Sequence, residues 1–103
     1  MLLEEQKKII EENEYVLIKY DSDYSESSRL LETRNLYIMI KNKYRGKIIN
    51  IEYKIEKDTN IFELNEISTV PTFVLYKNGK LLYNKIGNKG IKELVKLIAE
   101  EIN

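Results

Sequence analysis

Two serines three residues apart, Ser25 and Ser28, stand in the stretch "DYSESS" (residues 23–28), just before a segment with helical periodicity. Serine hydroxyls accept hydrogen bonds from the free N–H groups of a first helical turn, so either serine could be an N-cap. A serine can also act as a nucleophile beside a lysine base, and Lys19 is the candidate base in this sequence. No glycine pattern of the oxyanion-hole kind surrounds the two serines, which disfavours that chemistry.

Several kinds of site are excluded because the residues that build them are missing. The chain contains no cysteine and no histidine, which removes thiol chemistry, Ser–His and Cys–His nucleophile pairs and almost every zinc site. The sequence also has no calcium-loop pattern of carboxylates and neither of the glycine-rich nucleotide motifs. We therefore expect no metal site and no cofactor.

Size and charge indicate one ordinary domain. The 103 residues suffice for a single core, so we expect one domain over residues 1–103, and no stretch reaches the apolar length of a membrane span. Lysine plus arginine balance aspartate plus glutamate at 17 each, without a basic block for nucleic acid. The N-terminus lacks the pattern of a signal peptide. We expect a soluble, cytoplasmic monomer that binds neither nucleic acid nor membrane.

The first half of the chain alternates helix and strand. Residues 2–13 carry an amphipathic stripe, and residues 15–20 form an apolar run typical of a central strand that is covered on both faces. A second helix is predicted from about Ser25 to Asn42, with Gly46 ending the segment. Its expected apolar positions are Leu30, Leu31, Tyr37, Ile38 and Met39.

The second half adds a strand, a short helix, a hairpin and a last helix. Residues 47–55 are rich in β-branched and aromatic types, and residues 58–67 begin with capping residues. Asn78-Gly79 between two β-rich runs is a strong hairpin signal, and a final amphipathic helix follows the Gly87–Gly90 turn. The predicted order is α-β-α-β-α-β-β-α, an α/β fold whose mixed sheet has helices on both faces.

This order, with "STVPTFVLYKNGKLLYNKIG" near its end, resembles the thioredoxin family over almost the whole chain. The resemblance implies a four-stranded thioredoxin fold that lacks the family's N-terminal strand. Where the family has Trp-Cys-Gly-Pro-Cys, this chain has Tyr24 for the tryptophan and Ser25 and Ser28 for the cysteines. Val70-Pro71-Thr72 resembles the family's cis-proline loop, and an ordinary proline at a strand start is the alternative. Gly87 resembles the glycine that helps form the substrate groove.

The resemblance implies a binding surface without the family's chemistry. Thiol–disulfide exchange begins with attack by a thiolate, and a serine hydroxyl cannot replace it. Ser25 and Ser28 are then either engineered replacements in a disulfide oxidoreductase of cell redox homeostasis or natural residues of a silent binding or scaffold protein. In both cases we expect an extended peptide as the partner, in a groove lined by Tyr24, Ser25, Val70, Pro71, Thr72 and Gly87.

One charge pattern also departs from the family. The family usually carries a buried aspartate six residues before its first cysteine, with a lysine on the neighbouring strand. The same intervals lead here to Lys19 and Glu52, so the signs are exchanged. A lysine in an apolar strand is costly to bury unless it is paired, which predicts a buried Lys19–Glu52 ion pair. The alternatives are that Lys19 reaches water or pairs with Asp21.

Overall fold

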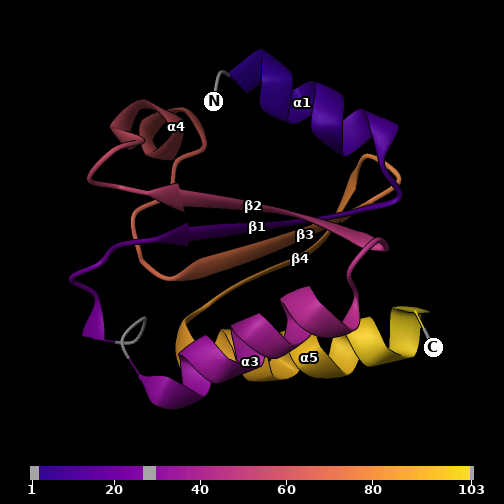
Figure 1. The fold of residues 1–103 in the computed structure, drawn as a ribbon. Helices are drawn as coiled ribbons and strands as arrows, with labels where there is room; N and C mark the ends of the chain where they lie inside the picture. Colours follow the sequence, from indigo (N-terminus) through magenta and orange to yellow (C-terminus); the bar gives the residue numbers. More distant parts are fainter. Residues whose placement is uncertain (1–2, 27–29, 103) are drawn as a thin grey trace.

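The computed structural model describes residues 3–26 and 30–102. Its elements follow the predicted order of helices and strands (Figure 1). The strands are β1 (Tyr15–Asp21), β2 (Ile48–Lys54), β3 (Thr72–Lys77) and β4 (Lys80–Ile86). The helices are α1 (Leu3–Glu12), α3 (Leu31–Lys43), α4 (Thr59–Leu64) and α5 (Gly87–Ile102).

The four strands form one mixed sheet in the order β2-β1-β3-β4. β1 runs parallel to β2 and antiparallel to β3, and the β3–β4 hairpin turns at Asn78 and Gly79, both with positive φ. The parallel pair requires a crossover, which α3 supplies, whereas the antiparallel strands need only the tight turn. β1 is buried along its whole length, as its unbroken apolar run predicted.

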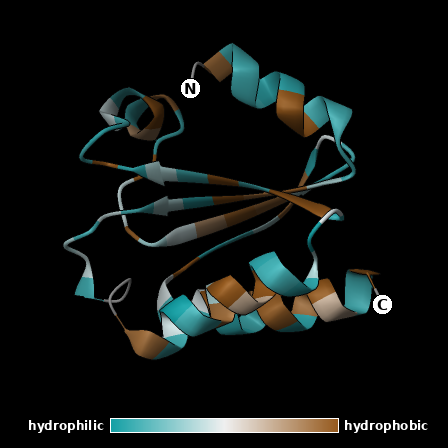
Figure 2. Cartoon of the chain, in the orientation of Figure 1, coloured by the Kyte–Doolittle hydropathy of each residue, from teal (hydrophilic) through white to brown (hydrophobic). Residues whose placement is uncertain are grey.

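Helices cover both faces of the sheet, with α1 and α4 on one side and α3 and α5 on the other (Figure 1). Two hydrophobic clusters fill the two layers, one beneath α3 and α5 around Leu17 and Phe73, the other around Ile18 and Tyr20. Figure 2 shows hydrophobic residues along the middle of the sheet, whereas α1 is mostly hydrophilic. Among the described residues, no helix is both long and apolar enough to span a bilayer.

The second long helix begins later than the sequence predicted. α3 starts at Leu31, and the residue before it, Leu30, is extended at φ −59° and ψ 129° and makes no side-chain cap. Ser25 is therefore not the N-cap of α3, and Ser28 lies outside the described residues. The Leu30 N–H still donates to the Glu26 carbonyl at 3.2 Å and the Leu30 carbonyl accepts the Arg34 N–H at 3.1 Å, so helical hydrogen bonds reach Leu30 although its own backbone is extended.

The buried face of α3 also differs from the prediction. Of the five expected apolar positions only Tyr37 is buried, whereas Leu30, Leu31, Ile38 and Met39 are exposed. Thr33, Tyr37 and Ile40 occur at helical spacing and are the residues that α3 buries. The error arose in part because Leu30 precedes α3 and Leu31 is its first residue.

Candidate functional site

The segment with Tyr24 and Ser25 follows the C-terminal end of β1. Its turn is closed by a hydrogen bond from the Ser25 N–H to the Ser22 carbonyl at 3.3 Å. Tyr24 is 80% exposed, so its ring is available to a partner. Strand ends beside a rigid sheet are common places for binding loops, because the sheet fixes their position.

Side chains from the end of β2 hold this segment in place. The Glu56 carboxylate accepts hydrogen bonds from the Ser22 hydroxyl at 2.7 Å and from the Asp23 N–H at 2.8 Å. The bond from Ser22 lowers the pKa of Glu56 below its ordinary value. The Lys54 ammonium lies 3.0 Å from the Asp23 carboxylate, so the first half of the turn is tied to the end of β2 and to Glu56 just after it.

Ser25 faces the loop that precedes β3. Its hydroxyl donates to the Val70 carbonyl at 3.4 Å, and the Val70–Pro71 peptide bond is cis. Pro71 in turn accepts a hydrogen bond from the Gly87 N–H at 2.9 Å, and Thr72 begins β3 as a buried residue. The structure thus brings Ser25, Val70, Pro71 and Gly87 into one connected row.

The Gly87 end of this row is fixed to α3. Asn88, the next residue, accepts a hydrogen bond from the buried Thr33 hydroxyl at 2.6 Å and donates to Glu32 at 2.9 Å. Lys92 pairs with the same Glu32 carboxylate at 2.7 Å. The hydrogen bond from Lys92 is the main reason that the pKa of Glu32 lies below its ordinary value, with Asn88 adding to it. This network links α3 to α5.

The expected Lys19–Glu52 ion pair does not form. The two residues are neighbours in the parallel register of β1 and β2, as the counted intervals implied. The Lys19 ammonium instead lies 2.9 Å from the Asp21 carboxylate, and Glu52 pairs with Lys41 of α3 at 3.2 Å. Lys19 and Asp21 are two residues apart in β1, so their side chains lie on the same face of the strand. Glu52 finds its cation in Lys41 of α3.

A tyrosine from α3 completes the surroundings of the buried lysine. The Lys19 ammonium lies 4.5 Å from the centroid of the Tyr37 ring, a cation–π distance. The Tyr37 hydroxyl is buried and has no hydrogen-bond partner among the described residues. Its burial raises the pKa of Tyr37 well above the ordinary value, and the nearby charges of Glu52 and Asp21 raise it further.

The segment around Ser25 presents groups suited to binding. No sulfur atom is available for disulfide exchange because the sequence has no cysteine. Lys19 pairs with Asp21 as an ammonium, which has no lone pair to take a proton from Ser25, so the serine nucleophile has no activated base in Lys19. The groups that remain are an exposed aromatic ring, a hydroxyl and backbone amides.

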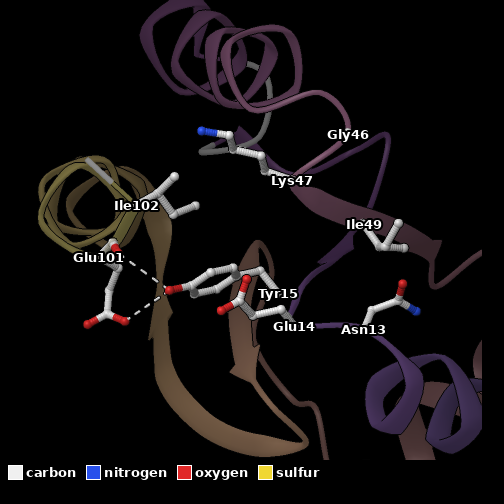
Figure 3. Close-up of a pocket in the computed structure, with 8 residues that line it drawn as sticks. All are labelled: Asn13, Glu14, Tyr15, Gly46, Lys47, Ile49, Glu101 and Ile102. Carbon is white, nitrogen blue, oxygen red and sulfur yellow. Dashed lines mark hydrogen bonds between the residues drawn. The ribbon is translucent and has the colours of Figure 1, made fainter.

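A separate cavity of about 450 Å³ lies at the other end of β1 (Figure 3). Its wall includes Glu101, which accepts a hydrogen bond from the Tyr15 hydroxyl at 3.3 Å and pairs with Lys77 at 2.9 Å. Since β1 runs from Tyr15 to Asp21, this cavity is about 20 Å from the Ser25 segment at the rise of a strand. Glu101 and Lys77 form an ion pair with each other, and none of the predicted site residues lines this cavity.

The supporting residues of the site were missed in the sequence. Glu56, Asn88 and Thr33 stand far from residues 24–25 along the chain, and only the folded sheet brings them to the site. Capping chemistry could have pointed to Asn88, because a polar residue after Gly87 opens α5. Glu56 gave no signal, since an acid after a strand usually faces solvent.

Comparisons with known proteins agree with this fold. The thioredoxin family model matches residues 3–100. Over 64 residues the chain is 31% identical to thioredoxin of Buchnera aphidicola, a match that spans 62% of this chain and 59% of that protein. The oxidised thioredoxin of Plasmodium falciparum superposes with a TM-score of 0.73 at 23% identity, covering 95% of this chain and 93% of that one.

A second solved structure gives the same result. Mitochondrial thioredoxin 3 of Saccharomyces cerevisiae, in its oxidised form, superposes with a TM-score of 0.80 at 21% identity. The superposition covers 95% of this chain and 89% of that one. At such identities the structural likeness shows the fold alone, and the family model carries the assignment.

Proposed function

Because the chain belongs to the thioredoxin family, we propose that it is a redox-silent member that holds an extended peptide in the groove beside Pro71. The family's redox motif is absent, since the chain has no cysteine at any position. The observation that carries the proposal is the contact of the Ser25 hydroxyl with the Val70 carbonyl, in the row that continues to Pro71 and Gly87. Val70 precedes β3 and lies outside its ladders to β1 and β4, so an extended strand can bond to the Val70 backbone.

A hollow of about 310 Å³, with Thr72 in its wall, offers a place for a peptide side chain. It is lined by Asn65, Glu66, Ile67, Ser68, Thr69, Thr72, Asn84 and Ile86. Ile86 is exposed and lies opposite Thr72 in the β3–β4 register. An extended peptide alternates its side chains, so one that pairs beside Val70 can direct a side chain into this hollow.

Two origins of the serines are compatible with this function. Ser25 and Ser28 are natural residues of a silent binding protein, or they replace the cysteines of a cytoplasmic protein-disulfide reductase. The codons for residues 25 and 28 in the source gene separate the two, because cysteine codons there identify replacement. The binding groove is the same in both cases.

A disulfide-exchange assay tests the silent half of the proposal. The chain as it stands reduces insulin disulfides no faster than buffer does, because no sulfur can form the mixed disulfide. The double variant Ser25→Cys/Ser28→Cys forms a disulfide within the motif in a glutathione buffer and gains activity. Single variants at each position are the matched controls, since neither can close that disulfide. Activity of the unmodified chain contradicts the proposal, and so does a double variant without an internal disulfide.

A further inference from the structure

The outer edge of β2 carries backbone groups that no strand pairs with in residues 3–26 and 30–102. β2 ends the sheet order β2-β1-β3-β4. The Ile55 N–H donates to the Asp21 carbonyl at 3.0 Å, and Asp21 lies opposite Lys54 in the parallel register. In a parallel ladder the backbone N–H and C=O groups of alternate residues point toward the neighbouring strand. In β2 it is the odd-numbered residues whose backbone groups point toward β1. The even-numbered residues turn their N–H and C=O groups outward.

The chain itself closes both ends of this edge. At one end the Ile48 N–H donates to the Tyr44 carbonyl at 3.0 Å, and the Asn50 side-chain amide donates to the Ile48 carbonyl at 3.3 Å. At the other end the Lys54 N–H donates to the Asp58 carboxylate at 3.0 Å, and the Lys54 carbonyl accepts the Asp58 N–H at 2.7 Å. The open part of the edge is short and lies between these closed ends.

The open part consists of the backbone of Asn50 and Glu52, one on each side of Ile51. An antiparallel copy of the same strand, related by a two-fold axis at Ile51, places each Asn50 opposite the Glu52 of the other copy. Residues opposite each other in this way exchange both hydrogen bonds, so every outward N–H and C=O of the two residues finds a partner. We propose that two copies of this chain pair through β2 in this register.

The charges along β2 favour this register over its neighbour. With the axis at Ile51, Glu52 meets Asn50, an uncharged amide, and Lys54 meets Ile48. With the axis moved to Glu52, two carboxylates would lie directly opposite each other, which destabilises a strand pair. That shifted register would also place Asn50 opposite Lys54, whose outward groups are already bonded to Asp58.

Exposed isoleucines lie beside the open edge. Ile49 is 40% exposed on β2. Ile38 is 50% exposed on α3 and precedes Lys41, which contacts Glu52, by one helical turn on the same face. A second copy of β2 and α3 would cover both side chains, which adds apolar contact to the backbone bonds. Ile38 was expected in the core, but within one chain both isoleucines are exposed.

The opposite edge of the sheet is protected. β4 carries Lys80 and Lys85, and the β3–β4 pair has a register irregularity at Leu75 and Tyr76. Lysines and bulges on an edge strand are the usual means of preventing edge-to-edge association. The asymmetry between the two edges therefore favours association through β2. The proposed dimer takes the place of the monomer expected from the sequence alone. The inference is independent of the peptide groove, because the two share no residue.

Sedimentation velocity of the full chain tests the pairing. Because the open ladder is short, we expect weak association, with the average mass rising toward that of a dimer between about 10 µM and about 1 mM. Asn50→Pro removes an outward N–H without touching the ladder to β1, and it abolishes the rise. Ile49→Lys places charge beside the edge and weakens association at least tenfold. Leu81→Lys on β4 is the matched control and leaves association unchanged.

The outcomes separate this account from its rivals. A chain that stays monomeric at all these concentrations overturns the pairing, and so does a dimer that Leu81→Lys abolishes while Ile49→Lys does not. Thermal unfolding followed by circular dichroism shows whether Asn50→Pro still folds. If that variant unfolds, the comparison of Ile49→Lys with Leu81→Lys decides the question, because both positions are exposed.

Discussion

The ammonium of Lys19 lies 2.9 Å from the carboxylate of Asp21, and the two side chains are only 8% and 3% exposed. A buried ion pair is expensive to form because both charges leave water. Here further groups share that cost: the Ser22 N–H donates to Asp21 at 2.7 Å, Lys54 approaches it at 3.5 Å, and the Tyr37 ring faces Lys19. The pair therefore belongs to a network that joins β1, β2 and α3.

Breaking this pair on one side should destabilise the fold more than removing it entirely. We expect Lys19→Met or Asp21→Asn alone to lower the free energy of unfolding by about 3 kcal/mol, because each removes the nearest opposite charge from a buried ionic group. The double variant should lose less than either single variant. Urea unfolding of all four proteins gives the coupling energy. A matched pair, Lys41→Met with Glu52→Gln, is the exposed control, and equal coupling in both cycles contradicts the buried network.

Removing the Glu56 carboxylate should loosen the segment that presents Tyr24 and Ser25. Glu56→Gln weakens the bonds from the Ser22 hydroxyl and the Asp23 N–H, which hold that turn to β2. We expect faster hydrogen exchange at the amides of residues 23–25 and weaker peptide binding, with little change in overall unfolding. Glu63→Gln on the exposed face of α4 is the control. Unchanged exchange at the turn would show that Glu56 does not position it.

Acid should remove stabilisation from three surface carboxylates. Hydrogen bonds from Lys92, Ser22 and Lys77 are the main causes that lower the pKa values of Glu32, Glu56 and Glu101 from the ordinary 4.5. A lowered pKa in the folded state means that the stabilisation is complete above pH 4.5 and is lost as the pH falls through the lowered values. NMR titration of the side-chain carboxyl carbons measures each pKa, and Lys77→Met should return that of Glu101 toward 4.5. A Glu101 pKa that does not respond to Lys77→Met rules out this cause.

The packing of α5 on β4 should be sensitive to a single methyl group. A Cβ on Gly90 would lie 3.1 Å from the backbone carbonyl carbon of Lys85, closer than an ordinary contact. Since backbone cannot move as a flexible side chain does, Gly90→Ala should lower the free energy of unfolding by about 1–3 kcal/mol. Lys89→Ala, one residue earlier and exposed, should change it by less than about 0.5 kcal/mol. Thermal unfolding of the two variants tests this, and equal stabilities would contradict the close contact.

Local sequence signals were enough to predict the fold. Strand β1 is one apolar run, the hairpin turns at Asn78-Gly79, and α5 has a regular stripe, so each element carried its own signal. The start of α3 was wrong because Leu30 is extended, a backbone choice that its apolar side chain does not reveal. Leu31 was among the expected apolar positions, yet it is exposed, and α3 buries Thr33 instead.

The site could be predicted only where the chain brings residues together by simple counting. The intervals placed Lys19 beside Glu52 on neighbouring strands, and the register agrees. The choice of ion-pair partner depended on Lys41 reaching Glu52 from α3 and on Asp21 sharing a face with Lys19, which needs three-dimensional distances. The same holds for Asn88 and Glu56, whose partners are more than thirty residues away in the chain.

The most direct test of the proposed function is NMR mapping of a peptide on the isotope-labelled chain. The probe is an unstructured peptide of about ten residues with a central cysteine, and the same peptide with serine is its control, because binding without disulfide exchange should treat the two alike. We predict saturable shifts at the amides of Tyr24, Ser25, Val70, Thr72 and Gly87, and neither peptide should become covalently attached. Shifts confined to the Glu101 cavity or to β2, or no shifts with either peptide, would contradict the account.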